Sequence, residues 1–151
     1  MVEGSRNPHQ NQKTMRLLGV VLLVGVLFYL LSTNNEGISV AVKDDHISLA
    51  YSSGESFDIR FKDILSVTEI QDLDTGNYIS GTETKRCKFG GWSNGQFGEY
   101  NLGIYAGVMR YIVVETSNGI LVFNFASEDE TESFYKAFLK LLQANQAKAA
   151  P

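Results

Sequence analysis

The sequence has a single cysteine, Cys87, among its 151 residues. One cysteine excludes an intrachain disulfide, and it excludes the paired-cysteine motifs of zinc and redox sites. The two histidines, His9 and His46, lie in different segments, and no carboxylates accompany them at metal-ligand spacing. We therefore expect no bound metal and no cofactor.

The sequence also lacks the residue sets that mark common catalytic sites. No Ser-His-Asp set and no carboxylate dyad stands out. The glycines between Gly90 and Gly103 match no nucleotide-binding motif, so we assign them to turns and strand bends. The acidic residues from Glu128 to Glu132 fit a helix N-terminus better than a cation site. We therefore expect a protein that is not an enzyme.

Long apolar runs are also absent from most of the chain, with one exception at Leu17–Leu31. A helix over residues 15–33 would span about 28 Å, close to the thickness of the hydrocarbon core of a bilayer. We interpret residues 15–33 as a single transmembrane anchor. The residues that form it include Leu17, Leu22, Leu27, Phe28, Tyr29 and Leu31.

Two other interpretations of this run remain open. A cleaved signal peptide would have the same basic start, but the nearest small-x-small site, Ser39-Val40-Ala41, begins well past the run and inside a predicted strand. A buried core helix is the other interpretation. It is less favoured, because a helix of a soluble domain usually has a polar face exposed to water, and this run has none. The anchor agrees best with the sequence.

Charge is divided unevenly around the run. Residues 1–16 carry three cations against Glu3, whereas residues 32–151 hold the remaining 10 Lys/Arg and 16 Asp/Glu, a net charge of −6. Excess positive charge favours the cytoplasmic side, so we expect a cytoplasmic N-terminus and an extracytoplasmic C-terminal domain at the cell membrane. An acidic domain has no general attraction to nucleic acid.

The first part of the domain alternates apolar and polar residues with a period of two, which is typical of half-buried strands. After a disordered tail at 1–14 and a linker at 34–37, the domain occupies residues 38–143. The alternation predicts an antiparallel series of strands at 38–42, 47–51, 57–61 and 64–70. Residues 71–99 break the pattern with six glycines, and we expect a long loop there with a short strand at 84–89.

The last third predicts a β-hairpin followed by a helix. Strands are expected at 108–116 and 120–125, joined by a turn that contains Asn118-Gly119. Ser127 and Glu130 have the spacing of a capping box, and apolar residues recur from Phe134 to Leu142 at helical spacing. We expect this helix to end near Gln143 and residues 144–151 to be disordered.

The stretch Gly98–Leu142 resembles the bacterial pleckstrin-homology (PH)-like domains of small membrane-anchored proteins. The resemblance lies in the order of a glycine-bearing segment, FGEYNLGIYAG, a hairpin, YIVVETSNGILVFNF, and a closing helix, SEDETESFYKAFLKLL. It implies a mainly β fold with one C-terminal α-helix, in which a PH-like small β-barrel or two-sheet sandwich of seven strands is capped by the helix. Phosphoinositide binding is not supported, because the first loop, residues 43–46, holds one lysine and two aspartates.

One basic and aromatic stretch is a candidate binding site, because Trp and Arg are enriched where proteins contact partners. Its residues are Lys85, Arg86, Lys88, Trp92, Phe97 and Tyr100. The alternative to a binding role is structural: the stretch would be an exposed strand protected by charges, with the tryptophan packed over the barrel end. We expect a non-catalytic interaction module that binds a protein or a second copy of itself through a sheet edge or through residues 85–100. A lipid or small-ligand domain that uses residues 85–100 or the barrel end is the alternative function.

The predicted topology can be tested by cysteine labelling in intact cells. In a Cys87→Ser background, we expect a membrane-impermeant thiol reagent to label Ser52→Cys and not Ser5→Cys, because only residue 52 would lie outside. Permeabilised cells, in which both positions should react, provide the control. Labelling of position 5 alone in intact cells would reverse the topology.

Overall fold

The fold is taken from a computed structural model that describes residues 37–149. The predicted tail at 1–14, the anchor at 15–33 and most of the linker at 34–37 lie outside the described residues. Within the described part of the chain, no helix combines the length and apolar character that a membrane span requires.

The chain begins with a small antiparallel sheet in the order β1-β2-β3. Its strands are β1 (Ile38–Val42), β2 (His46–Tyr51) and β3 (Ser56–Arg60). Alternate residues of these strands are buried, in agreement with the period-two pattern of the sequence. A short 3₁₀ helix, η1 (Phe61–Asp63), then leads the chain into a second sheet.

The second sheet has six strands in the order β4-β8-β9-β7-β6-β5. They are β4 (Ile64–Gln71), β5 (Asn77–Glu83), β6 (Cys87–Asn94), β7 (Gly98–Tyr105), β8 (Arg110–Thr116) and β9 (Gly119–Phe123). All neighbours are antiparallel except β7 and β9, which run parallel. The chain ends with helix α2 (Glu128–Ala149).

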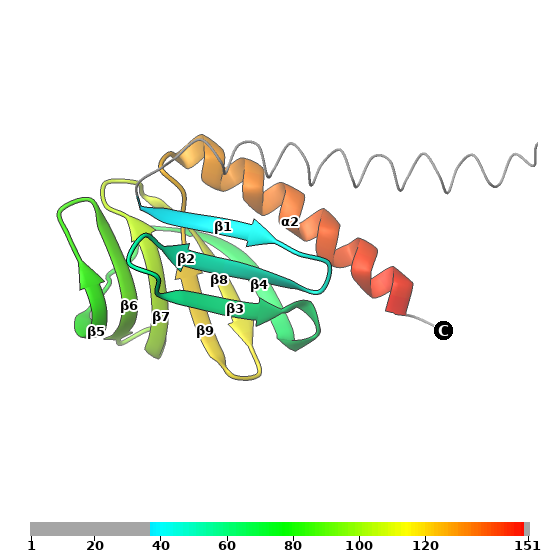
Figure 1. The fold of residues 1–151 in the computed structure, drawn as a ribbon, viewed down its shortest axis with the longest axis horizontal. Helices are drawn as coiled ribbons and strands as arrows, with labels where there is room; N and C mark the ends of the chain where they lie inside the picture. Colours follow the sequence, from blue (N-terminus) through cyan, green and yellow to red (C-terminus); the bar gives the residue numbers. More distant parts are fainter. Residues whose placement is uncertain (1–36, 150–151) are drawn as a thin grey trace, which may run out of the picture.

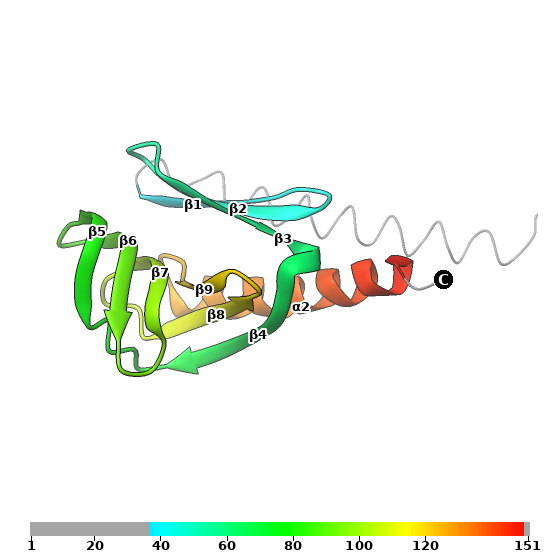
Figure 2. The ribbon, with the colours of Figure 1, turned by 90° about the horizontal axis from the view of Figure 1, so that it is seen from below.

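The two sheets form two layers (Figure 1), and α2 lies level with β8 and β9 rather than with the small sheet (Figure 2). In Figure 2 the small sheet lies above β8, β9 and α2, while β5, β6 and β7 turn upward at one end. The six-stranded sheet is therefore strongly curled. Strand β1 lies on the side of the small sheet toward α2, and β3 lies on the opposite side (Figure 1).

The main hydrophobic core lies between the small sheet, the six-stranded sheet and α2. Phe89 of β6 is fully buried and stacks on Phe57 of β3, with ring centroids 4.8 Å apart. Phe134 and Phe138 of α2 supply the helical side of this core. Burial of such side chains contributes about 1.5–3 kcal/mol each, so the core accounts for most of the attraction between the layers.

A second core lies on the other face of the six-stranded sheet. It contains Trp92, Tyr100, Leu102, Ile104, Tyr111, Val113 and Val122. Central strands such as β8 and β9 are consequently buried on both faces, which explains why they read as nearly continuous apolar runs in the sequence.

Two buried polar groups fix how the strands meet. The hydroxyl of Tyr105 donates to the carbonyl of Ile38 and accepts from its N–H, both at 3.0 Å, and so connects β7 to β1. The side chain of Asn124 is fully buried; its Oδ1 accepts from the N–H of Tyr105 at 2.7 Å, and its Nδ2 donates to the carbonyls of Tyr105 and Val108. These bonds satisfy backbone groups that burial would otherwise leave unpaired.

The sequence correctly predicted a mainly β fold with one C-terminal helix, but the closed barrel is wrong. Residues 37–149 form nine strands rather than seven, and no strand pair among them joins one sheet to the other. The physical reason is that η1 carries the chain out of the small sheet before β4 begins, so β3 and β4 belong to different layers.

The long loop predicted for residues 71–99 is also wrong, because most of it forms β5 and β6. The turn between them lies at Thr84–Arg86, within the strand expected at 84–89. The two strands cross closely at the pair Gly81 and Gly90, where a Cβ on Gly90 would lie 2.1 Å from the carbonyl oxygen of Ser80. The glycines that suggested a loop are therefore required for close strand pairing.

The hairpin and the start of the helix agree with their predictions, but the strand ends and the helix end differ: β8 begins at residue 110, and β9 spans residues 119–123. The β8–β9 turn consists of Ser117 and Asn118, and Gly119 already pairs with Thr116. Ser127 Oγ accepts from the N–H of Glu130 at 3.2 Å, as expected for an N-cap. The helix continues to Ala149 rather than ending near Gln143, because residues 144–149 are rich in alanine, a strong helix former.

Replacement of Asn124 tests its role at the junction of β7, β8 and β9. We expect Asn124→Ala to lower the free energy of unfolding by about 2–4 kcal/mol, because it leaves buried backbone groups of Tyr105 and Val108 unpaired. Asn101→Ala, at an exposed position, should change it by less than about 0.5 kcal/mol. Denaturant unfolding followed by circular dichroism measures both, and equal effects of the two variants would contradict this role.

Candidate functional site

The basic and aromatic stretch predicted as a binding site does not form one exposed surface. Lys85 and Arg86 lie exposed at the turn between β5 and β6. Lys88 is partly buried, where its Nζ is 3.3 Å from a carboxylate oxygen of Glu83 and donates to the Thr75 hydroxyl at 3.1 Å. A role for Lys85 and Arg86 in partner binding stays a prediction.

Trp92 belongs to the second core rather than to a surface. It is 2% exposed, and the ring of Tyr78 meets it edge-on with centroids 5.5 Å apart. The Nζ atom of Lys88 lies 4.6 Å from the centre of its ring, a cation–π contact. Its indole N–H finds no hydrogen-bond partner among the described residues. The packing around Trp92 agrees with the structural alternative.

Tyr100 and Phe97 complete the same buried cluster. The hydroxyl of Tyr100 donates to the carbonyl of Thr75 at 2.9 Å, and the Phe97 ring packs edge-on against the Tyr100 ring. Burial raises the pKa of Tyr100 to about 12, because the charged phenolate would lose its hydration. Cys87 is also buried, in the main core, and burial raises its pKa as well. A buried, protonated thiol is a poor nucleophile.

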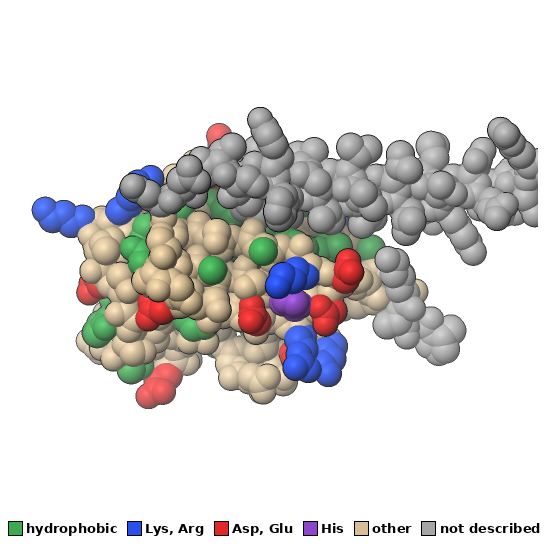
Figure 3. All heavy atoms as spheres, in the orientation of Figure 1, with side chains coloured by type: hydrophobic (Ala, Val, Ile, Leu, Met, Phe, Trp, Pro, Cys, Tyr) green, Lys and Arg blue, Asp and Glu red, His purple; other side chains and the backbone are tan. Residues whose placement is uncertain are grey.

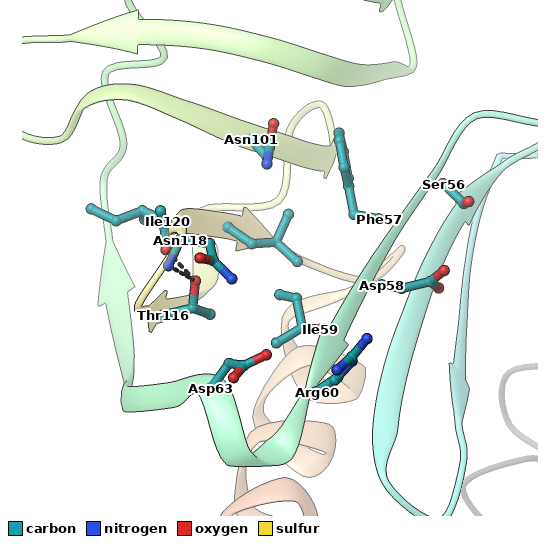
Figure 4. Close-up of a pocket in the computed structure, with 12 residues that line it drawn as sticks. Ser56, Phe57, Asp58, Ile59, Arg60, Asp63, Asn101, Thr116, Asn118 and Ile120 are labelled. Atoms are coloured by element: carbon teal, nitrogen blue, oxygen red, sulfur yellow. Dashed lines mark hydrogen bonds between the residues drawn. The ribbon is translucent and has the colours of Figure 1, made fainter.

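The described residues form a cleft of about 260 Å³ between the two sheets, which we call the inter-sheet cleft. It is shown in Figure 4. One wall consists of all of β3, and the other consists of residues from β7, β9, η1, the end of β8 and the β8–β9 turn. The residues that line it are Ser56, Phe57, Asp58, Ile59, Arg60, Asp63, Asn101, Thr116, Asn118, Gly119, Ile120 and Leu121.

The β3 wall combines an apolar inner side with a charged outer side. Phe57 and Ile59 point toward the cleft, whereas Asp58 points away from it (Figure 4). This follows from the strand period, since alternate residues of β3 are half-buried and exposed. Every residue of β3 lines the cleft and no residue of β1 or β2 does, so the cleft runs along the edge of the small sheet.

The opposite wall is a part of the six-stranded sheet that the small sheet leaves uncovered. Along the inner face of β7, Gly103 is buried, and a Cβ there would lie 2.5 Å from Leu49 of β2. Two residues earlier on the same face, Asn101 is exposed. The small sheet therefore covers β7 at Gly103 but not at Asn101, and the amide of Asn101 lines the cleft.

Hydrogen bonds fix the cleft at both ends. At one end the N–H of Ser117 donates to the carbonyl of Asp63 at 3.0 Å, which joins the β8–β9 turn to η1. At the other end the hydroxyl of Thr82 in β5 donates to the carboxylate of Glu55 at 3.2 Å, just before β3. The cleft is thus held by contacts between elements distant in sequence.

The charges at the outer side of the small sheet are mixed in sign. Figure 3 shows acidic and basic side chains gathered around His46, the histidine of the described residues, near the end of the sheet. The Nδ1 atom of His46 lies 2.6 Å from Oδ1 of Asp45, and this hydrogen bond lowers the pKa of Asp45. Within residues 37–149, no three acidic, histidine or cysteine side chains gather as metal ligands. The inter-sheet cleft itself is lined by Asp58, Arg60 and Asp63, and charges of both signs favour selective recognition over general attraction to one charge sign.

No pattern in the sequence indicated the inter-sheet cleft. Its walls come from β3 and from residues 101 and 116–121, which are separated by more than forty positions. The exposed alternate residues of β3 were visible in the sequence as the polar half of SFDIR. Nothing in that pattern showed which edge of the strand would be left unpaired.

The chain matches no family model, and comparison with curated proteins and with solved structures gave no match either.

Truncation of Trp92 separates its structural role from a role in binding. We expect Trp92→Ala to lower the free energy of unfolding by about 3–5 kcal/mol, the usual cost of removing a large buried aromatic side chain. Lys85→Ala, in the exposed part of the same stretch, should cost less than about 0.5 kcal/mol. Because Trp92 is the one tryptophan of the chain, iodide should quench its fluorescence weakly in the folded state. Strong quenching or an unchanged stability would place it on the surface.

Proposed function

We propose that this protein is a non-catalytic interaction module, held at a membrane surface by residues 15–33, that binds a partner protein in the inter-sheet cleft. The observation that carries the proposal is the uncovered edge of β3 beside an exposed part of the six-stranded sheet. Both walls are held in place by the folded core, so the site needs no rearrangement to receive a ligand.

The chemistry of the cleft supports a protein ligand. Phe57, Ile59 and Leu121 supply apolar surface, while Asn101 and Asn118 supply amides that can donate and accept hydrogen bonds. Asp58 and Arg60 add one charge of each sign at the rim. Apolar contacts surrounded by polar groups are the usual arrangement at protein interfaces.

A membrane anchor supports the proposal because it would raise the effective concentration of the domain near other membrane proteins. Residues 15–33 carry the apolar run Leu17–Leu31, which is long enough for an anchor when its flanks are included. A domain held at a membrane meets other membrane proteins at high effective concentration, so a small site with modest affinity suffices. Under this proposal the domain lies outside the cytoplasm, as the charge asymmetry favours.

Membership in the PH-like domains remains part of the proposal rather than its basis. The mainly β fold with one closing helix agrees with the resemblance, while the two open sheets differ from the barrel it implies. Burial of Trp92 and Tyr100 takes these two side chains out of the surface that residues 85–100 would offer to a lipid or small ligand. The inter-sheet cleft therefore replaces residues 85–100 as the main candidate site.

Site-specific photo-crosslinking tests the proposal on the full-length chain in membranes. We expect a photoreactive amino acid at Asn118, on the cleft wall, to give a discrete crosslinked product. The same group at Asp129, exposed at the start of α2, should give much less. The cleft variant Asn101→Trp should reduce the Asn118 product at least about tenfold, because the larger side chain fills the site.

The controls separate binding from folding. Lys140→Trp, which places the same large side chain at an exposed position of α2 away from the cleft, should retain the Asn118 product. Equal crosslinking from Asn118 and Asp129, or a product unaffected by Asn101→Trp, would contradict binding in the cleft.

A further inference from the structure

We infer that the partner enters the inter-sheet cleft as an extended peptide segment that pairs with β3 and becomes the fourth strand of the small sheet. The inference rests on the proposed function and adds the conformation and chemistry of the ligand. It is argued from the backbone of β3, the uncovered sheet beside it and the charges at its edge.

The backbone of β3 presents unpaired hydrogen-bonding groups to the cleft. The N–H of Tyr51 donates to the carbonyl of Glu55, and the N–H of Phe61 donates to the carbonyl of Asp45, so residues 55 and 61 point their backbone groups toward β2 and its extension. Antiparallel pairs alternate in this respect, so Phe57 and Ile59 also bond to β2. The N–H and C=O groups of Ser56, Asp58 and Arg60 therefore face the open edge.

Within the described residues, no strand occupies that open edge. The small sheet ends at β3, and the cleft runs along all five of its residues. An exposed strand edge is a template for another extended chain, and addition of a peptide strand to such an edge is a recurrent mode of recognition.

A fourth strand would also complete the layer above the six-stranded sheet. Neighbouring strands lie about 4.8 Å apart, so an added strand would pass above the part of the sheet that β3 leaves uncovered. Asn101 and Gly119 are exposed there, whereas Gly103 and Leu121, closer to the small sheet, are buried. The peptide would thus pair with β3 by its backbone and cover this face by its inward side chains.

The side chains around the edge define the peptide. Inward positions would lie beside Phe57 and Ile59 and above Asn101, which favours apolar side chains with an amide or hydroxyl near the asparagine. Outward positions would lie beside Asp58 and Arg60, where opposite charges are stabilising across strands and like charges are not. We infer a segment that alternates apolar residues with a basic residue beside Asp58 and an acidic residue beside Arg60.

A second folded copy does not fit this edge. Two copies paired through β3 would be related by a two-fold axis perpendicular to the small sheets, so both six-stranded sheets would lie on the same side. Each six-stranded sheet extends past β3 at Asn101 and the β8–β9 turn, and so would enter the space of the other. A single extended segment avoids this overlap.

The test uses a displayed library of random nine-residue peptides, selected against the full-length chain in detergent micelles. Amide hydrogen exchange is then measured by NMR with and without the selected peptides. In the free chain we expect slow exchange at Phe57 and Ile59 and fast exchange at Asp58 and Arg60. Bound peptide should slow exchange at Asp58 and Arg60 at least about tenfold and leave Phe57 and Ile59 unchanged.

A matched pair of substitutions at one residue isolates the backbone contribution. Asp58→Pro removes the outward N–H, which is tolerated on an edge strand because that group has no partner in the small sheet. Asp58→Ala removes the same carboxylate and retains the N–H. We expect Asp58→Pro to weaken peptide binding about tenfold relative to Asp58→Ala, with the circular dichroism spectrum of both variants unchanged.

The outcomes distinguish this inference from the proposed function. If Asn118 gives the crosslinked product but the selected peptides leave the Asp58 and Arg60 amides in fast exchange, the cleft remains the site and strand addition is overturned. Failure to select any peptide, or equal binding by the two Asp58 variants, would also overturn it. If these amides are protected in the free chain and the protection increases with protein concentration, a second copy occupies the edge and the inference is overturned.

Discussion

The hydroxyl of Tyr105 joins the two sheets by bonding both backbone groups of Ile38, the first residue of β1. Gly37 lies directly against that hydroxyl, where a Cβ would come within 2.7 Å of it. These contacts fix one corner of the small sheet above the end of β7. Because strands are spaced about 4.8 Å apart, fixing β1 also sets β3 about 10 Å further across the six-stranded sheet. The position of the inter-sheet cleft follows from this geometry.

The small sheet has only three strands, and this number determines what remains uncovered. Its β1 side lies toward α2, whereas its β3 side ends over the six-stranded sheet. Folded proteins usually protect exposed strand edges with charge, and β3 carries Asp58 and Arg60 on its outer side. Charges of opposite sign discourage indiscriminate pairing while leaving the backbone groups accessible to a segment with the complementary pattern.

Strands with one buried face were readable from the sequence, as were the apolar strands β8 and β9, whereas β5 and β6 were missed. The alternation in residues 38–60 predicted β1, β2 and β3 closely, because alternate residues are buried in β1 and β2 and half-buried in β3. β5 was missed because nearly all its residues are exposed, so it carries no apolar alternation. β6 was missed because Gly90 and Gly91 are required where it crosses β5, and glycine clusters usually indicate loops. The helix was recognised from its cap and apolar spacing, although its last turns, rich in alanine, were mistaken for a tail.

The sequence by itself determined the class of the fold, its separation into strands and one helix, and the division of the chain by one apolar run. These properties depend on local periodicity and on the distribution of apolar and charged residues along the chain. Only the tertiary structure decided that the sheets stay open, that Trp92 and Tyr100 are buried, and that β3 has a free edge. Strand order and sheet packing depend on contacts such as that between Tyr105 and Ile38, 67 positions apart, which leave no local pattern in the sequence.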